Sequence, residues 1–252
     1  MARILNQLVK SDESIMRQLW AMYQTRTSLK LINSFRGLPI SFDAQIRTVN
    51  NGYIIVQTHP HQAMCVSLEK RTYIQGDFLE GTARAQPIDV DVSAGEVILT
   101  RITQAGRDLG QRLSPRVEPG EPVRVDIRLR DTTLTANLAD LSYQGIGLYT
   151  FGAYINDRAD FRRGDEVSFA VNMHGALNGP LRLFGCVTNI SREQNSMLYR
   201  VGVQMTPVPE PQKLIQSYIH SRREEILCEL DETYRTLACR KYLTMLPRPA
   251  GN

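Results

Sequence analysis

The sequence predicts a mainly β protein: two small antiparallel β-barrels, with a helix near the N-terminus and a long helix near the C-terminus. Three observations lead to this prediction. Short β-branched or alternating segments fill most of the chain, and glycine, proline or asparagine separates them. A connector rich in glycine, proline and arginine divides these segments into two groups. Helical periodicity is found only in the first and last parts of the chain.

The first group of elements lies N-terminal to the connector. Residues 12–26 place their apolar side chains on one helical face, and Ser11 or Asp12 can cap the first amides. Asn51-Gly52 indicates a two-residue hairpin of type I′, in which both central residues have φ > 0. The strand pattern fits a small barrel or sandwich, with strands expected in segments 29–35, 38–49, 52–58, 63–69 and 89–102.

The second group follows the connector and ends at a proline-rich segment. It holds six strand candidates, a number that suits a closed or nearly closed barrel. In residues 122–130 (PVRVDIRLR) apolar and polar residues alternate strictly, as in a strand with one buried face. Beyond it, a narrow apolar stripe interrupted by Arg222 and Thr233 predicts a helix that docks on a barrel or a partner helix. The expected divisions are 1–105, the connector 106–119, 120–208 and the helix 209–243.

Composition and charge are those of an ordinary globular protein. The chain has 252 residues, is 42% hydrophobic and 22% charged, and has a net charge of +4. This mild basic excess permits contact with phosphates but does not require a polyanionic partner. No apolar run reaches the roughly 18–20 residues of a transmembrane helix. The start of the chain lacks the apolar segment of a secretory signal, and the four cysteines are widely spaced, so we expect free thiols and a cytoplasmic location.

The connector carries a pair of arginines directly before the second barrel. Arg112 and Arg116 stand four residues apart in R-L-S-P-R, within a segment that has a local excess of positive charge. A guanidinium group matches phosphate in a bidentate fashion and stacks on aromatic faces. Taken alone, such a pair is more often an exposed linker with solvated arginines.

The segment DLSYQG sits between two predicted strands of the second barrel. Asp140, Ser142 and Gly145 fit a polar turn in which side chains bond to local backbone and glycine permits φ > 0. They also fit a binding site, because a carboxylate and a hydroxyl can accept hydrogen bonds from the donor edge of guanine. Glycine would then allow a ligand to approach closely.

Together, the two motifs form a much rarer pattern. Arg112 and Arg116, followed 24 residues later by D-x-S-x-x-G, resemble the signature R-x-x-x-R…D/N-x-S-x-x-G of the PilZ domain, the bacterial receptor for cyclic di-GMP. The later GVQM at 202–205 resembles the closing strand of that barrel. The order of elements is similar to that of the flagellar brake group of PilZ proteins, which implies that the N-terminal domain is split-barrel-like.

The resemblance implies a receptor that changes its domain arrangement when cyclic di-GMP binds and thereby regulates a protein partner. A role in motility, with the flagellar motor as partner, would follow. The implied ligand-binding residues are Arg112, Arg116, Asp140, Ser142 and Gly145, and further candidates are Gln111, Arg107 and Gly147. Flagellar brake proteins often have arginine where this chain has Gln111, which leaves open whether one ligand or an intercalated pair binds.

No other constellation predicts chemistry. Catalytic motifs and metal-ligand spacings are absent from the sequence, so neither an enzyme nor a cofactor is expected. The arginines are not interleaved with aromatic residues, which makes direct binding of nucleic acid a minority interpretation. The alternatives are a ligand-responsive DNA-binding regulator and a structural adaptor that binds no nucleotide. The chain is expected to be a monomer or a homodimer.

Overall fold

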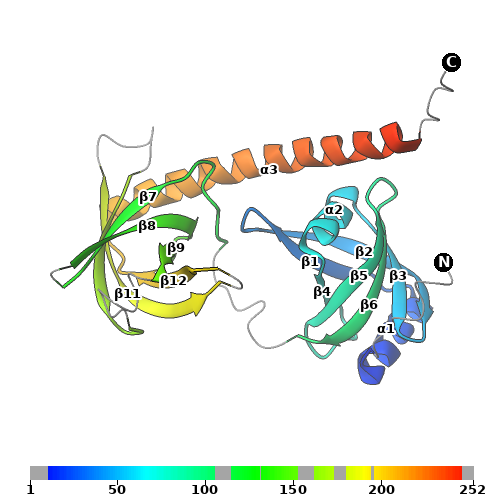
Figure 1. Cartoon of the computed structure of the whole chain (residues 1–252). Coiled ribbons are helices and arrows are strands. Elements are labelled where there is room, and N and C mark those ends of the chain that lie inside the picture. Colours follow the sequence, from blue (N-terminus) through cyan, green and yellow to red (C-terminus); the bar gives the residue numbers. More distant parts are fainter. Residues whose placement is uncertain are drawn as a thin grey trace, which may run out of the picture. The chain divides into compact units, whose positions relative to one another are not determined.

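The structure, a computed structural model, describes residues 11–105, 115–130, 132–152, 162–172, 180–193 and 196–245. These residues form two compact units, each built around one closed antiparallel barrel of six strands (Figure 1). The prediction of a mainly β protein with two barrels and a helix near each end is confirmed. Within the described ranges, no helix combines the length and the apolar character that a membrane span requires.

The barrel of the first unit has the strand order β1-β2-β3-β6-β5-β4. Its core consists of buried aliphatic side chains that alternate along the strands, as in β1, where Leu29 and Leu31 are buried and Lys30 between them is exposed. The strands are β1 (Leu29–Phe35), β2 (Leu38–Asn50), β3 (Tyr53–Thr58), β4 (Thr72–Gln75), β5 (Ala83–Asp91) and β6 (Glu96–Gln104).

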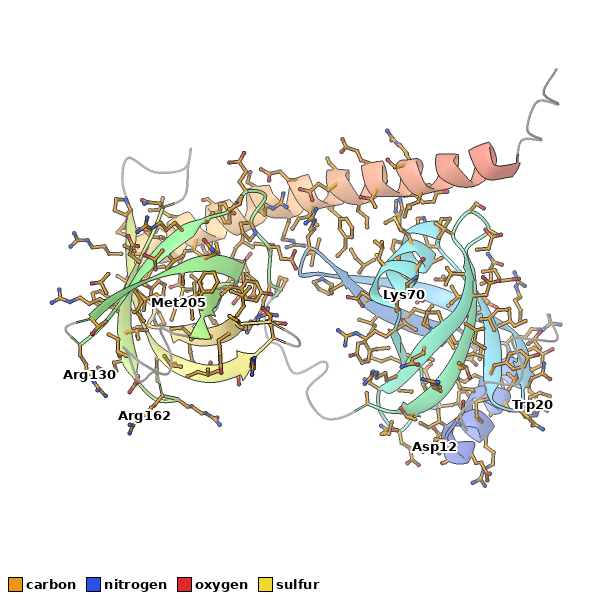
Figure 2. The ribbon with its side chains drawn as sticks, viewed as in Figure 1. Asp12, Trp20, Lys70, Arg130, Arg162 and Met205 are labelled. Carbon is orange, nitrogen blue, oxygen red and sulfur yellow. The ribbon has the colours of Figure 1, made fainter. Side chains whose placement is uncertain are left out.

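Helix α1 (Glu13–Thr25) packs on this barrel through its apolar face. Asp12 is its N-cap, since the Asp12 carboxylate accepts a hydrogen bond from the Ser14 amide at 2.9 Å. Ile15, Leu19 and Met22 are buried against the barrel core. Figure 2 labels the cap residue Asp12 and the half-exposed Trp20 on this helix.

A second helix, α2 (Pro60–Glu69), replaces the strand expected at residues 63–69. His59 caps it and Pro60 occupies its first turn, where a missing amide proton does no harm. The prediction was wrong because five consecutive residues, 62–66, are buried. Because this central turn of the helix is buried all round, it shows no amphipathic period, and a short apolar run is then easily mistaken for a strand.

The hairpin at Asn51-Gly52 is confirmed, but its turn type is not. Strands β2 and β3 pair from Asn50 opposite Tyr53, so two residues form the loop. Gly52 has φ of +96°, whereas Asn51 does not have a positive φ, and type I′ requires positive values at both. Only the glycine uses the left-handed region here.

The barrel of the second unit has the strand order β10-β11-β12-β9-β8-β7, and all six predicted strands are present. Along β7, Val125, Ile127 and Leu129 point into the core, as the alternation predicts. Arg130 and Arg162 are exposed at one end of this barrel (Figure 2). The strands are β7 (Arg124–Leu129), β8 (Thr132–Leu141), β9 (Gly145–Phe151), β10 (Glu166–Val171), β11 (Leu181–Arg192) and β12 (Leu198–Met205).

Helix α3 (Pro209–Met245) confirms the predicted C-terminal helix. Its isoleucine stripe is buried, and so is Arg222, which interrupts that stripe and is only 3% exposed. The Arg222 guanidinium donates from Nε to the carbonyl of Glu118 at 2.8 Å and pairs with Glu225 at 2.9 Å. The interruption is therefore a polar anchor between α3 and the segment that enters the second barrel.

We predict that Leu99→Ala lowers the free energy of unfolding of the first unit by about 2–5 kcal/mol, because a buried leucine is replaced by a cavity. Leu99 is fully buried in β6, within the core cluster. Trp20, the single tryptophan, lies on α1 in this unit, so its fluorescence follows the unfolding of the unit in urea and measures the change.

Leu68→Ala is the matched control, since Leu68 is 49% exposed on α2. Its effect should stay within about 0.5 kcal/mol. Equal effects of the two substitutions would contradict the assignment of Leu99 to the core.

Candidate functional site

Asp140 lies near the end of β8, where a β-bulge redirects its side chain. The register of β8 against β9 shifts between Leu138 and Asp140, and the alternating pattern of β8 gives way to four consecutive buried residues. A bulge re-aims the side chains that follow it. As a result Leu141 continues the core, while Asp140 lies opposite Gly147 and is only 2% exposed.

Two arginines cover the Asp140 carboxylate. Arg116 donates from Nη1 to Oδ1 at 3.0 Å, and Arg200 on β12 pairs with Oδ2. The Arg116 side chain is 32% exposed and that of Arg200 38%, so both guanidinium groups remain open to solvent on one side. Each carboxylate oxygen therefore has one cationic partner, as a buried carboxylate requires.

Arg116 reaches this position because the chain beside it joins the barrel edge. Val117 and Leu141 exchange two backbone hydrogen bonds of 2.9 Å each. Next to them, the Glu118 carbonyl accepts the hydrogen bond from Arg222 of α3. The end of the connector is thus fixed to both β8 and α3, and Arg116 of the first motif meets Asp140 of the second.

Ser142 and Gly145 form the turn between β8 and β9. The Ser142 amide and hydroxyl both donate to the Gly145 carbonyl, at 2.8 and 3.1 Å. The Ser142 side chain is buried and satisfied within the turn, as the polar-turn interpretation predicts. The positive φ that this interpretation allowed for Gly145 is not found. A side chain at Gly145 would crowd the Val203 carbonyl, since a Cβ atom there would lie 3.0 Å from it.

Glycines form the floor beside Asp140. Gly147 on β9 pairs with Gly202 on β12 and with Asp140 on β8. A Cβ atom at Gly147 would lie 2.6 Å from Asp140 Oδ2, whereas one at Gly202 would meet nothing closer than 3.5 Å. The absent side chain at Gly147 leaves room for the Asp140 carboxylate, which lies over this glycine.

Arg200 is also held by an aromatic ring. Its guanidinium carbon lies 5.8 Å from the centroid of the Tyr149 ring, and the two residues are register partners on β12 and β9. Burial disfavours the charged form of Arg200, but the ion pair and hydrogen bond with Asp140 outweigh it, so the pKa of the guanidinium is raised.

The site has the donors and acceptors for an anionic, hydrogen-bonding ligand. Among the described residues, no group of three or more His, Cys, Asp or Glu side chains is placed to hold a metal ion. Exposed guanidinium groups suit phosphate, and a carboxylate beside a glycine floor suits a flat donor edge.

A comparison with family models matches residues 110–221 to the PilZ domain. The chain carries a PilZ domain. The matched region spans both sequence motifs, the second barrel and the first part of α3. No match was found among curated proteins.

Several solved structures are similar to this chain. The MrkH–c-di-GMP complex of K. pneumonia has a TM-score of 0.44 and 14% identity, over 88% of this chain and 99% of that one. YcgR of Escherichia coli in complex with c-di-GMP has a TM-score of 0.43 and 16% identity, over 90% and 98%. The inhibitor of motility MotI/DgrA of Bacillus subtilis has a TM-score of 0.40 and 11% identity, over 79% and 96%. These scores and identities are low, so the family assignment rests on the matched domain and its residues.

The sequence motifs locate part of the site. Of the predicted residues, Arg116, Asp140 and Gly147 are in one cluster, and Ser142 and Gly145 form the adjacent turn. Arg107, Gln111 and Arg112 lie outside the described residues. Arg200 and Tyr149 were not predicted, because only the pairing of β9 with β12 brings them to Asp140. The available signal was that Arg200 is a polar residue on the outward face of the predicted strand YRVGVQM.

We predict that Gly147→Ala destabilises the PilZ domain by about 1–3 kcal/mol, since the added methyl group forces the Asp140 carboxylate from its place. Urea unfolding of the full chain, followed by far-ultraviolet circular dichroism, measures this change.

Gly202→Ala provides the control from the paired position, where the methyl group meets only ordinary contacts. This variant should be neutral or more stable, by up to about 1 kcal/mol, because alanine loses less backbone entropy on folding. The same loss of stability in both variants would show that Asp140 does not impose the glycine at 147.

Proposed function

We propose that this chain is a receptor for cyclic di-GMP that catalyses no reaction and acts by changing its contacts with a partner protein. The observation that carries the proposal is the 3.0 Å pair between Arg116 and Asp140, because it unites the two halves of the PilZ signature in one site. Control of motility through the flagellar motor is the proposed setting. A cytoplasmic location belongs to the proposal, and the described cysteines Cys65, Cys186 and Cys228 are free.

The chemistry of the ligand fits the groups at the site. Guanine presents two adjacent donors, N1–H and N2–H₂, to which a carboxylate can accept side by side. Asp140 supplies that carboxylate, which lies over Gly147. The phosphates of the dinucleotide suit the guanidinium groups of Arg116 and Arg112, which bind such oxygens in a bidentate fashion.

Ligand binding must replace a contact that already exists. In the structure, Arg116 occupies Oδ1 of Asp140, one of the two oxygens that guanine would use. We infer an exchange in which Arg116 turns to a phosphate while guanine takes its place on Asp140. This exchange changes the connector, so ligand binding orders residues 106–118 and reorients the domains.

We predict that Arg112→Ala weakens binding of cyclic di-GMP at least 100-fold, because a bidentate charge-assisted contact to phosphate is lost. Arg116→Ala should weaken it by about 10-fold or more. That loss is smaller, because removing Arg116 also frees Asp140 from a competing partner. Isothermal titration of the full chain gives both affinities and the number of ligands bound.

Arg182→Ala is the control, since Arg182 is an exposed arginine on β11 and pairs opposite Ala170. It should bind normally, and cyclic di-AMP should not bind. Unchanged affinity in Arg112→Ala would overturn the assignment of the site. A flat titration of the unmodified chain would instead identify a structural adaptor, and a ligand-dependent gel shift that weakens with salt would identify a DNA-binding regulator.

A further inference from the structure

Arg200 spans three strands of the PilZ domain and takes no part in its signature motif. Arg200 stands on β12 opposite Tyr149 of β9, and its side chain pairs with Asp140 on β8. Tyr149, its register partner, supports the guanidinium from beneath. This arrangement needs a glycine at 147, since a side chain there would occupy the space of the Asp140 carboxylate.

Arg116 and Arg200 hold the same carboxylate in different ways. Arg116 belongs to the end of the connector, and among the described residues its guanidinium pairs with Asp140. Arg200 stands within a barrel strand and has both Asp140 and the Tyr149 ring as partners. The first partner is therefore exchangeable and the second is fixed.

A fixed partner is needed once Arg116 turns away. The Asp140 side chain is only 3% exposed, and leaving a buried charge without a counterion is strongly unfavourable. Arg200 remains at Oδ2 and keeps a cationic partner beside the carboxylate. Each carboxylate oxygen has two lone-pair directions, so Oδ2 can accept from Arg200 and from the ligand together.

We propose that Arg200 is a specificity-determining positioning residue: it fixes the Asp140 carboxylate in the orientation that recognises the N1–H and N2–H₂ edge of guanine. The inference rests on the proposed function, because it concerns how that same site selects its base. Its role is to orient Asp140, and it differs from a direct contact to phosphate, which would stabilise every cyclic dinucleotide equally.

The test compares cyclic di-GMP with cyclic di-IMP, whose hypoxanthine bases lack the 2-amino group. Isothermal titration of the full chain gives the ratio of the two dissociation constants, which measures recognition of N2–H₂ at the carboxylate. We expect Arg200→Met to lower the dissociation constant of cyclic di-IMP divided by that of cyclic di-GMP about 10-fold, because an unfixed carboxylate no longer aligns with both donors of guanine. Arg200→Lys keeps the charge and should restore part of the ratio.

Arg182→Met, at an exposed position on β11, should leave both dissociation constants unchanged. Circular dichroism checks that each variant is folded. If Arg200→Met does not fold, the same ratio is measured with Arg200→Lys. An unchanged ratio, including equal weakening of both ligands, would overturn the positioning role. Failure of the unmodified chain to bind cyclic di-GMP would instead contradict the proposed function itself.

Discussion

The site depends on one buried carboxylate shared between two guanidinium groups. Asp140 is almost fully buried, and an isolated charge at such a depth would be very unfavourable. Arg116 and Arg200 each take one of its oxygens, so the charge is compensated in the structure. Removing either partner leaves the carboxylate open to another donor, and that property makes the arrangement suitable for recognition.

Two features of the second barrel, a bulge in β8 and a glycine on β9, position the Asp140 carboxylate. The bulge before Asp140 interrupts the alternation of β8, so that the Asp140 side chain does not join the apolar core, whereas Leu141 does. Gly147 on β9 leaves room for the Asp140 carboxylate, and Arg200 on β12 pairs with that carboxylate. Three strands therefore contribute to a single ion-pair network, and its geometry follows from their register and not from any local motif.

Local patterns predicted most of the fold, because alternation and turn residues report directly on which face is buried. The strands of the second barrel followed from such patterns, as in β7 with its inward Val125 and Ile127. Helix α2 was mistaken for a strand because burial on all sides removes the helical period. Arg200 escaped notice for another reason: it meets Asp140 across 60 residues of sequence, through a strand pairing that neither segment encodes alone.

The surroundings of Arg116 explain how a small exchange can affect a larger element. The backbone at Val117 is bonded on both sides to Leu141, so Arg116 can change partner through its side chain while its backbone stays in place. One residue further, Glu118 accepts the buried Arg222 of α3, and a side chain at Gly120 would crowd that arginine at 3.3 Å. Only Val117 therefore stands between Arg116 and Glu118, the residue that binds the anchor of α3. The proposed exchange at Asp140 would take place beside the segment that holds α3 to the PilZ domain.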